Sequence, residues 1–134
     1  MLLLDSEALS VLAHGRPARG RDRIRALIAE MRRRNLPVGT VAAVLAEVVR
    51  GRRADAAVFS GLRRERVEVH SVDVRVGVRA GQLLGRLRAG SELAVDAFLV
   101  AVADLAGGAV IATGDLVDLQ RLAAHADAVQ IVEI

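Results

Sequence analysis

The chain has 134 residues, which suits one domain of ordinary size, and we expect a single domain over residues 1–134. Apolar residues make up 53% of the sequence and only two residues are aromatic, so Leu, Val, Ile and Ala must build the core. The absence of Cys excludes disulfides, thiol nucleophiles and thiolate metal sites. All 19 basic residues are Arg, which excludes a Lys-dependent phosphate loop and a Schiff-base enzyme.

The most apolar stretch, residues 93–112, does not predict a membrane span. Asp96 and Asp104 interrupt it, and each such charge costs about 2.5–3.5 kcal/mol at the centre of a bilayer. The three leucines after Met1 meet Asp5 at once, so they are too short for the core of a signal peptide. We therefore expect a cytoplasmic protein with no membrane partner.

Short apolar runs alternate along the chain with segments of helical periodicity. In chain order, the pattern predicts a strand at 1–4, a helix at 6–14, a loop at 15–20, a helix at 21–34, a strand at 36–39, helices at 41–50 and 54–64, a strand at 67–72, helices at 74–88 and 91–106, a strand at 109–112, a helix at 116–126 and a strand at 129–132. Ser91 is the predicted N-cap of its helix. Strands separated by helices predict an α/β fold with a mainly parallel sheet and helices on both faces.

Two carboxylates stand directly after predicted strands. Asp5 follows the first strand, and Asp115 follows the fourth strand after Thr113. Parallel α/β sheets bind ligands beyond the carboxyl ends of their strands, at the point where the strand order reverses. If the first and fourth strands are neighbours there, the two carboxylates face each other. For either residue alone, capping of the next helix is an equally good explanation.

Two further acids lie within apolar segments. Glu47 is surrounded by Ala, Val and Leu, and Asp96 lies in a similar helix, so we expect both side chains to be substantially buried. A buried charge must be paired or bound to a metal, because an unpaired one costs several kcal/mol. An Arg partner is the structural alternative for each. Asp104 follows Asp96 by eight positions and so points about 80° away from it on a helix. It is therefore interpreted as solvated or paired with Arg.

Several carboxylates in one pocket repel one another unless cations neutralise them. Oxygen ligands suit Mg²⁺ or Mn²⁺ and not zinc, and the three His residues are scattered along the chain. Sites of this kind typically hydrolyse phosphodiesters, since the metal activates water and stabilises the leaving oxygen.

Four motifs in order resemble the PIN-domain ribonucleases, specifically the single-domain VapC toxins of VapBC toxin–antitoxin modules. They are the run of Leu before Asp5-Ser6, the segment around Glu47, Asp96 on its helix, and the stretch that holds Thr113, Asp115 and Asp118. The resemblance implies a three-layer fold with strand order 3-2-1-4-5. It also implies Mg²⁺ or Mn²⁺ ligation by Asp5, Glu47, Asp96 and Asp115, with assistance from Asp118, and a site shaped by Thr113 and Ser6. An RNA substrate, a cognate antitoxin and a homodimer are further implications.

The arginines add a weaker indication of a polyanionic substrate. Setting the five acids of the motifs aside leaves 11 of the 16 acidic residues against 19 Arg. A basic rim around an acidic pocket is what RNA requires. Arg75, Arg79 and Arg86 form the most regular stripe, for which an ordinary solvated helix face is the alternative.

The sequence thus predicts a Mg²⁺-dependent endoribonuclease toxin that cuts RNA. The alternative is a non-enzymatic α/β domain that binds nucleic acid or protein and whose acids are structural.

Overall fold

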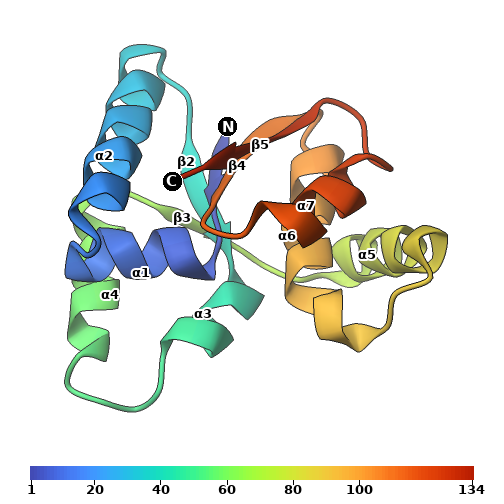
Figure 1. Ribbon diagram of the computed structural model, residues 1–134, viewed down its shortest axis with the longest axis horizontal. Coiled ribbons are helices and arrows are strands. Elements are labelled where there is room, and N and C mark those ends of the chain that lie inside the picture. Colours follow the sequence, from blue (N-terminus) through green and yellow to red (C-terminus); the bar gives the residue numbers. More distant parts are fainter.

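A five-stranded parallel sheet runs through the middle of the molecule in the computed structural model, which describes residues 1–134 (Figure 1). The strand order is β3-β2-β1-β4-β5. The strands are β1 (Leu2–Leu4), β2 (Val38–Val41), β3 (Glu68–His70), β4 (Ala109–Thr113) and β5 (Val129–Glu133). β1 is central, with Leu3 beside Gly39 of β2 and Leu4 beside Ala112 of β4. The strand order reverses between β1 and β4.

The helices cover the sheet on both faces (Figure 1). One layer contains α1 (Ser6–His14), α2 (Ala18–Arg33) and α4 (Asp55–Arg64), and the other contains α5 (Val74–Leu87), α6 (Ala94–Leu105) and α7 (Leu116–Ala123). The short α3 (Ala42–Val48) contacts both α1 and α6. It therefore bridges the two layers at the carboxyl end of the sheet. The predicted three-layer fold and its strand order are confirmed.

Aliphatic side chains form one continuous core. Leu2, Leu3 and Leu4 of β1 are completely buried because helices cover both faces of this central strand. Ile24 and Ile28 bury the inner face of α2 four residues apart, as helical periodicity predicts. None of the helices has the length and apolarity that crossing a membrane requires.

Several boundaries differ from the sequence prediction, and β2 lies at Val38–Val41 where a strand at 36–39 is predicted. Helix α2 begins at Ala18 and includes Gly20, which had indicated a loop. A Cβ on Gly20 would stand 3.4 Å from Val11, so this glycine lets α2 pack closely against α1. The predicted N-cap at Ser91 is wrong. Ser91–Leu93 forms a 3₁₀ turn, and α6 starts after it without a side-chain cap.

Candidate functional site

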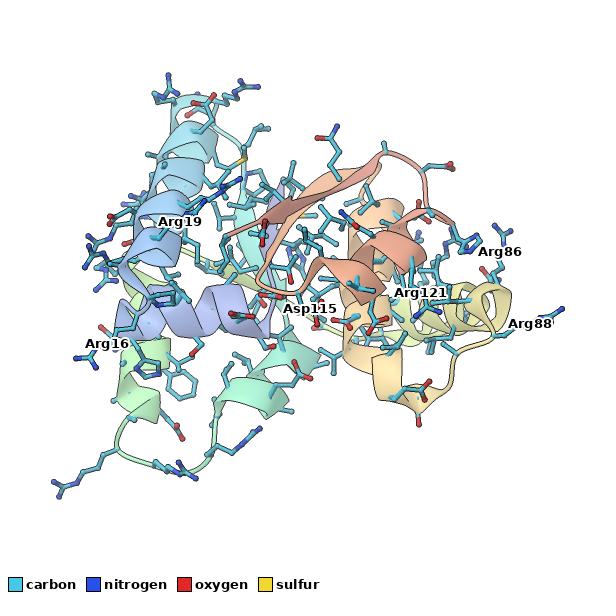
Figure 2. The ribbon with its side chains drawn as sticks, viewed as in Figure 1. Arg16, Arg19, Arg86, Arg88, Asp115 and Arg121 are labelled. Atoms are coloured by element: carbon cyan, nitrogen blue, oxygen red, sulfur yellow. The ribbon has the colours of Figure 1, made fainter.

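The carboxyl edge of the sheet brings Asp5 and Asp115 together at the strand-order reversal. The backbone N–H of Asp5 donates to Ala112 of β4 at 3.2 Å, which continues the pairing of β1 and β4 past the end of β1. Asp115 follows Thr113, the last residue of β4. Figure 2 shows Asp115 between the end of α1 and the α6–α7 layer. The fold therefore places these two strand ends face to face, as the sequence predicts.

Asp5 is buried and holds the start of α1. Its Oδ1 accepts the N–H of Ala8 at 2.7 Å, so the residue is an N-cap. Burial raises the pKa of the Asp5 carboxyl to about 6, although the nearby Thr113 side chain and the N–H of Ala8 favour the charged form. The nearby carboxylates of Glu7 and Glu47 also raise this pKa. Capping thus accounts for one oxygen and leaves the charge without a cationic partner.

Asp96 occupies the first turn of α6 and is half-buried. Burial raises its pKa to about 6, and repulsion adds to the effect from four carboxylates, which are those of Glu47, Asp5, Asp118 and Asp115. The other four acids that the sequence motifs single out therefore all lie within electrostatic reach of Asp96. None of Asp5, Glu47, Asp96 and Asp115 forms an ion pair with Arg.

Asp104 on the same helix α6 shows what a structural acid looks like in this protein. Its Oδ2 accepts from Arg79 at 2.6 Å, and its Oδ1 accepts the backbone N–H of Asp127 at 2.7 Å. These bonds lower the pKa of Asp104 despite its burial. The interpretation of Asp104 as paired with Arg is confirmed. The Arg partner considered as an alternative for Asp96 does not exist.

The turn after β4 is built around a buried hydroxyl. Thr113 is completely buried, and its Oγ1 accepts the N–H of Asp115 and donates to the carbonyl of Asp115, each at 2.9 Å. The Asp115 carboxylate accepts the N–H of Val117 at 3.2 Å and caps α7. Asp118 lies in the first turn of α7 and pairs with Arg121 at 2.9 Å. Ser6, the first residue of α1, is half-buried.

The predicted burial of Glu47 is wrong. Its side chain is exposed, because α3 has only seven residues and buries only Val44 completely. The apolar residues around Glu47 lie on a small bridging helix that is covered on one face. Glu47 still lies close enough to the cluster for its charge to raise the pKa values of both Asp5 and Asp96.

The three arginines of the predicted stripe, Arg75, Arg79 and Arg86, are not all free to bind RNA. Arg79 is engaged by Asp104 and by the carbonyl of His125 at 3.0 Å, and its side chain is only 18% exposed. It therefore joins α5, α6 and the end of α7 and is not available to a polyanion. Arg75 and Arg86 are exposed.

The sequence reasoning missed two residues of the site. The Glu7 carboxylate fills the space where a Cβ on Gly114 would stand, so Gly114 accommodates a sixth acid at the edge of the cluster. Thr40 is completely buried, and its hydroxyl donates to the carbonyl of Leu4 at 2.7 Å, directly before Asp5. A lone Thr in the apolar strand β2 was the signal for it.

The donor chemistry of the cluster fits a hard divalent cation. Its members offer carboxylate oxygens only, and their charges are desolvated or repel one another, which a cation would relieve. The three His residues lie elsewhere, at the end of α1, at the end of β3 and after α7. No three acidic or His side chains already stand in an arrangement that holds one ion. Side-chain adjustment must therefore accompany binding of a cation.

Comparison with known proteins agrees with this fold. The family model described as PIN domain matches residues 2–125. The chain belongs to the PIN-domain family. No curated protein matches this PIN domain. Among solved structures, it is similar to a chain in the crystal structure of VapBC2 from Rickettsia felis bound to a DNA fragment from their promoter. That match has a TM-score of 0.66 at 14% identity and covers 99% of this chain and 98% of that chain.

Proposed function

We propose that this PIN domain is a metal-dependent endoribonuclease and the VapC-type toxin of a toxin–antitoxin module. The observation that carries the proposal is the convergence of four carboxylates without cationic partners, from β1, α3, α6 and the β4–α7 turn. An α/β domain with purely structural acids would pair them as it pairs Asp104. The non-enzymatic alternative has no such observation in its favour.

Asp5, Glu47, Asp96 and Asp115 would hold Mg²⁺ or Mn²⁺, and Asp118 would assist them. When bound, the metal supplies an activated water at neutral pH and stabilises the leaving oxygen of the phosphodiester. The chain positions these ligands: the start of α1 fixes one oxygen of Asp5, and Thr113 fixes the turn that carries Asp115. The surplus of Arg elsewhere suits an RNA chain in the cytoplasm.

The toxin assignment draws support from the VapBC2 structure and from the electrostatics of the cluster. That structure contains VapBC2, and the fold of its matched chain extends over 99% of this chain. An anionic cluster is readily blocked by a partner's Arg or Lys that enters in place of the metal. We therefore propose an antitoxin protein as partner. The homodimer that the family resemblance implies stays a prediction.

The test of catalysis is metal dependence. RNA cleavage should require Mg²⁺ or Mn²⁺ and disappear in EDTA. Ca²⁺ should bind without supporting turnover, because its coordination is larger and looser. A denaturing gel of a labelled single-stranded RNA follows the reaction. Equal cleavage with and without the chelator would exclude the metal site.

The test of the toxin assignment is growth of the host. Expression of the chain alone should arrest growth, and co-expression of the adjacent small gene should restore it. The Asp96→Asn variant, expressed to the same level, is the control and should be harmless. Undisturbed growth with a preparation that cleaves RNA in vitro would contradict the toxin role.

A further inference from the structure

A small pocket adjoins the acidic cluster on the α7 side. It has a volume of about 250 Å³ and lies between the end of α5, the 3₁₀ turn Ser91–Leu93 and α7. Asp118 lines this pocket and also contributes to the repulsion at Asp96. A ligand in the pocket would therefore lie directly beside the site that we propose for cleavage.

Two arginines line this pocket. Arg88 ends α5 in the left-handed conformation with φ 53°, is exposed and forms no ion pair. Arg121 uses Nη1 for Asp118 and leaves its remaining donors free. The bond to Asp118 already restricts the Arg121 side chain, so this side chain loses less conformational entropy when it binds a ligand. In Figure 2, Arg121 lies between Asp115 and Arg88.

The two carboxylates of the pocket are already engaged. Glu92 accepts the backbone N–H of Gly90 at 2.8 Å, and Asp118 accepts from Arg121 at 2.9 Å. The charged hydrogen-bond donors that line the pocket are the guanidinium N–H groups of its two arginines, which match phosphate oxygens. Neither Phe of the chain lines the pocket, so stacking on a base has no platform there.

We propose that Arg88 and Arg121 bind a backbone phosphate of the RNA strand, next to the phosphate held at the acidic cluster. This inference rests on the proposed function, because it assigns a second contact to the same substrate. It replaces the stripe on α5 as the basic part of the RNA-binding surface. The two arginines act as positioning residues: they hold the strand and do not take part in the chemical step.

Arg86 provides a matched control. It is an exposed Arg on the same helix, two residues before Arg88, and it does not line the pocket (Figure 2). The variants are Arg88→Gln, Arg121→Gln and Arg86→Gln, together with Arg121→Lys, which keeps the charge beside Asp118. Melting temperatures of all four should match that of the parent protein, since these side chains are exposed.

The experiment measures binding of a labelled single-stranded RNA of about ten nucleotides by fluorescence anisotropy. Ca²⁺ replaces Mg²⁺, and a gel verifies that the RNA stays intact. Each phosphate contact on a single strand contributes about 0.7 to the slope of log affinity against log salt, or about fivefold in affinity at 0.1 M salt. Arg88→Gln and Arg121→Gln should each lose that much, for any RNA sequence. Arg86→Gln should stay within twofold of the parent, and Arg121→Lys should retain most of the slope.

Cleavage kinetics in Mg²⁺ supply the second readout. Arg88→Gln should raise KM about fivefold and leave kcat within twofold, as expected for uniform binding of the substrate. If the parent protein binds and cleaves RNA but Arg88→Gln and Arg121→Gln behave like Arg86→Gln, the subsite is overturned and the nuclease stands. If the parent neither binds nor cleaves RNA, the proposed function and the subsite fail together.

Discussion

At the scale of single residues, the partner of a carboxylate separates the site from the scaffold. Asp96 and Asp104 lie on the same helix within apolar sequence, yet the charged groups nearest to them have opposite signs. Repulsion and burial raise the pKa of Asp96 to about 6, whereas Arg79 and a backbone N–H lower the pKa of Asp104. The free energy of unfolding should therefore respond oppositely when either residue loses its charge.

Asp96→Asn removes one of five repelling charges at nearly constant volume. In EDTA at pH 7, the free energy of unfolding should rise by about 1 kcal/mol. This is a discounted share of the 1.36 kcal/mol per pKa unit, because the side chain keeps some contact with solvent. RNA cleavage in Mg²⁺ should fall to background. Urea unfolding and a gel-based cleavage assay measure the two quantities.

Asp104→Asn is the matched control on α6. It leaves Arg79, which is 18% exposed, without its charged partner and should cost about 2 kcal/mol. Cleavage per folded molecule should be unchanged. If Asp96→Asn destabilised the protein as much and cleavage survived, Asp96 would be a structural residue.

At the scale of elements, β2 fixes the end of β1. Thr40→Val removes the hydroxyl that donates to Leu4 at nearly the same volume, which should cost about 1–2 kcal/mol. Because Leu4 directly precedes Asp5, cleavage should fall by more than the folded fraction does. Thr40→Ser keeps the hydroxyl and should retain cleavage, even though it loses a buried methyl group worth about 0.8 kcal/mol. Thermal unfolding and cleavage of all three proteins decide this, and wild-type cleavage by folded Thr40→Val would exclude the positioning role.

Local patterns predicted most elements, and contacts between elements explain the exceptions. The helix at 6–14 matches α1, since Asp5 and Gly15 mark its two ends with local capping signals. Gly20 was misread because its role lies in the approach of α1 to α2, which no local pattern records. The burial of Glu47 was overestimated for a similar reason: apolar neighbours in sequence do not reveal how little of α3 the rest of the protein covers.

The sequence predicted which acids belong to the site, but it did not predict how their side chains are arranged and paired. Strand ends and the family resemblance identified Asp5 and Asp115, and the structure brings them to one edge of the sheet. The sequence could not show that Arg79 belongs to Asp104, because the two residues are 25 positions apart on different helices. Nor could it show Glu7 against Gly114, which depends on how α1 meets the β4–α7 turn.

At the scale of the whole molecule, the raised pKa values predict an unusual pH dependence of metal-free stability. Asp5 and Asp96 bind protons near pH 6 in the folded protein but near pH 4 when unfolded. Between these values the folded state holds more protons, so the free energy of unfolding should fall as pH rises from about 4 to 6 and stay low above it. The buried Asp5 alone should contribute about 2–3 kcal/mol to this fall. Urea unfolding in EDTA at pH 4.5, 6 and 7.5 measures it.

The double variant of Asp5→Asn and Asp96→Asn isolates this effect from other titrations. Asn also serves as an N-cap, so α1 should keep its start. The double variant should be more stable than the parent at pH 7.5 in EDTA and nearly equal to it at pH 4.5. Mg²⁺ at pH 7.5 should stabilise the parent protein and leave the variant almost unchanged. If the free energy of unfolding of the parent protein and of the double variant changed in the same way between pH 4.5 and 7.5 in EDTA, Asp5 and Asp96 would not form a cluster of repelling carboxylates.

The place of β1 at the centre of the sheet has a consequence during translation. This strand is synthesised before the other four, yet one of its two neighbours, β4, is synthesised last but one among the strands. About 110 residues separate Asp5 from Asp115, which is roughly 5–20 s of synthesis at 5–20 residues per second. A nascent chain that stops short of β4 has neither the second partner of β1 nor the carboxylate that faces Asp5. If the chain is the RNA-cutting toxin that we propose, it therefore has no assembled site with which to cut its own message while most of the chain is still being made.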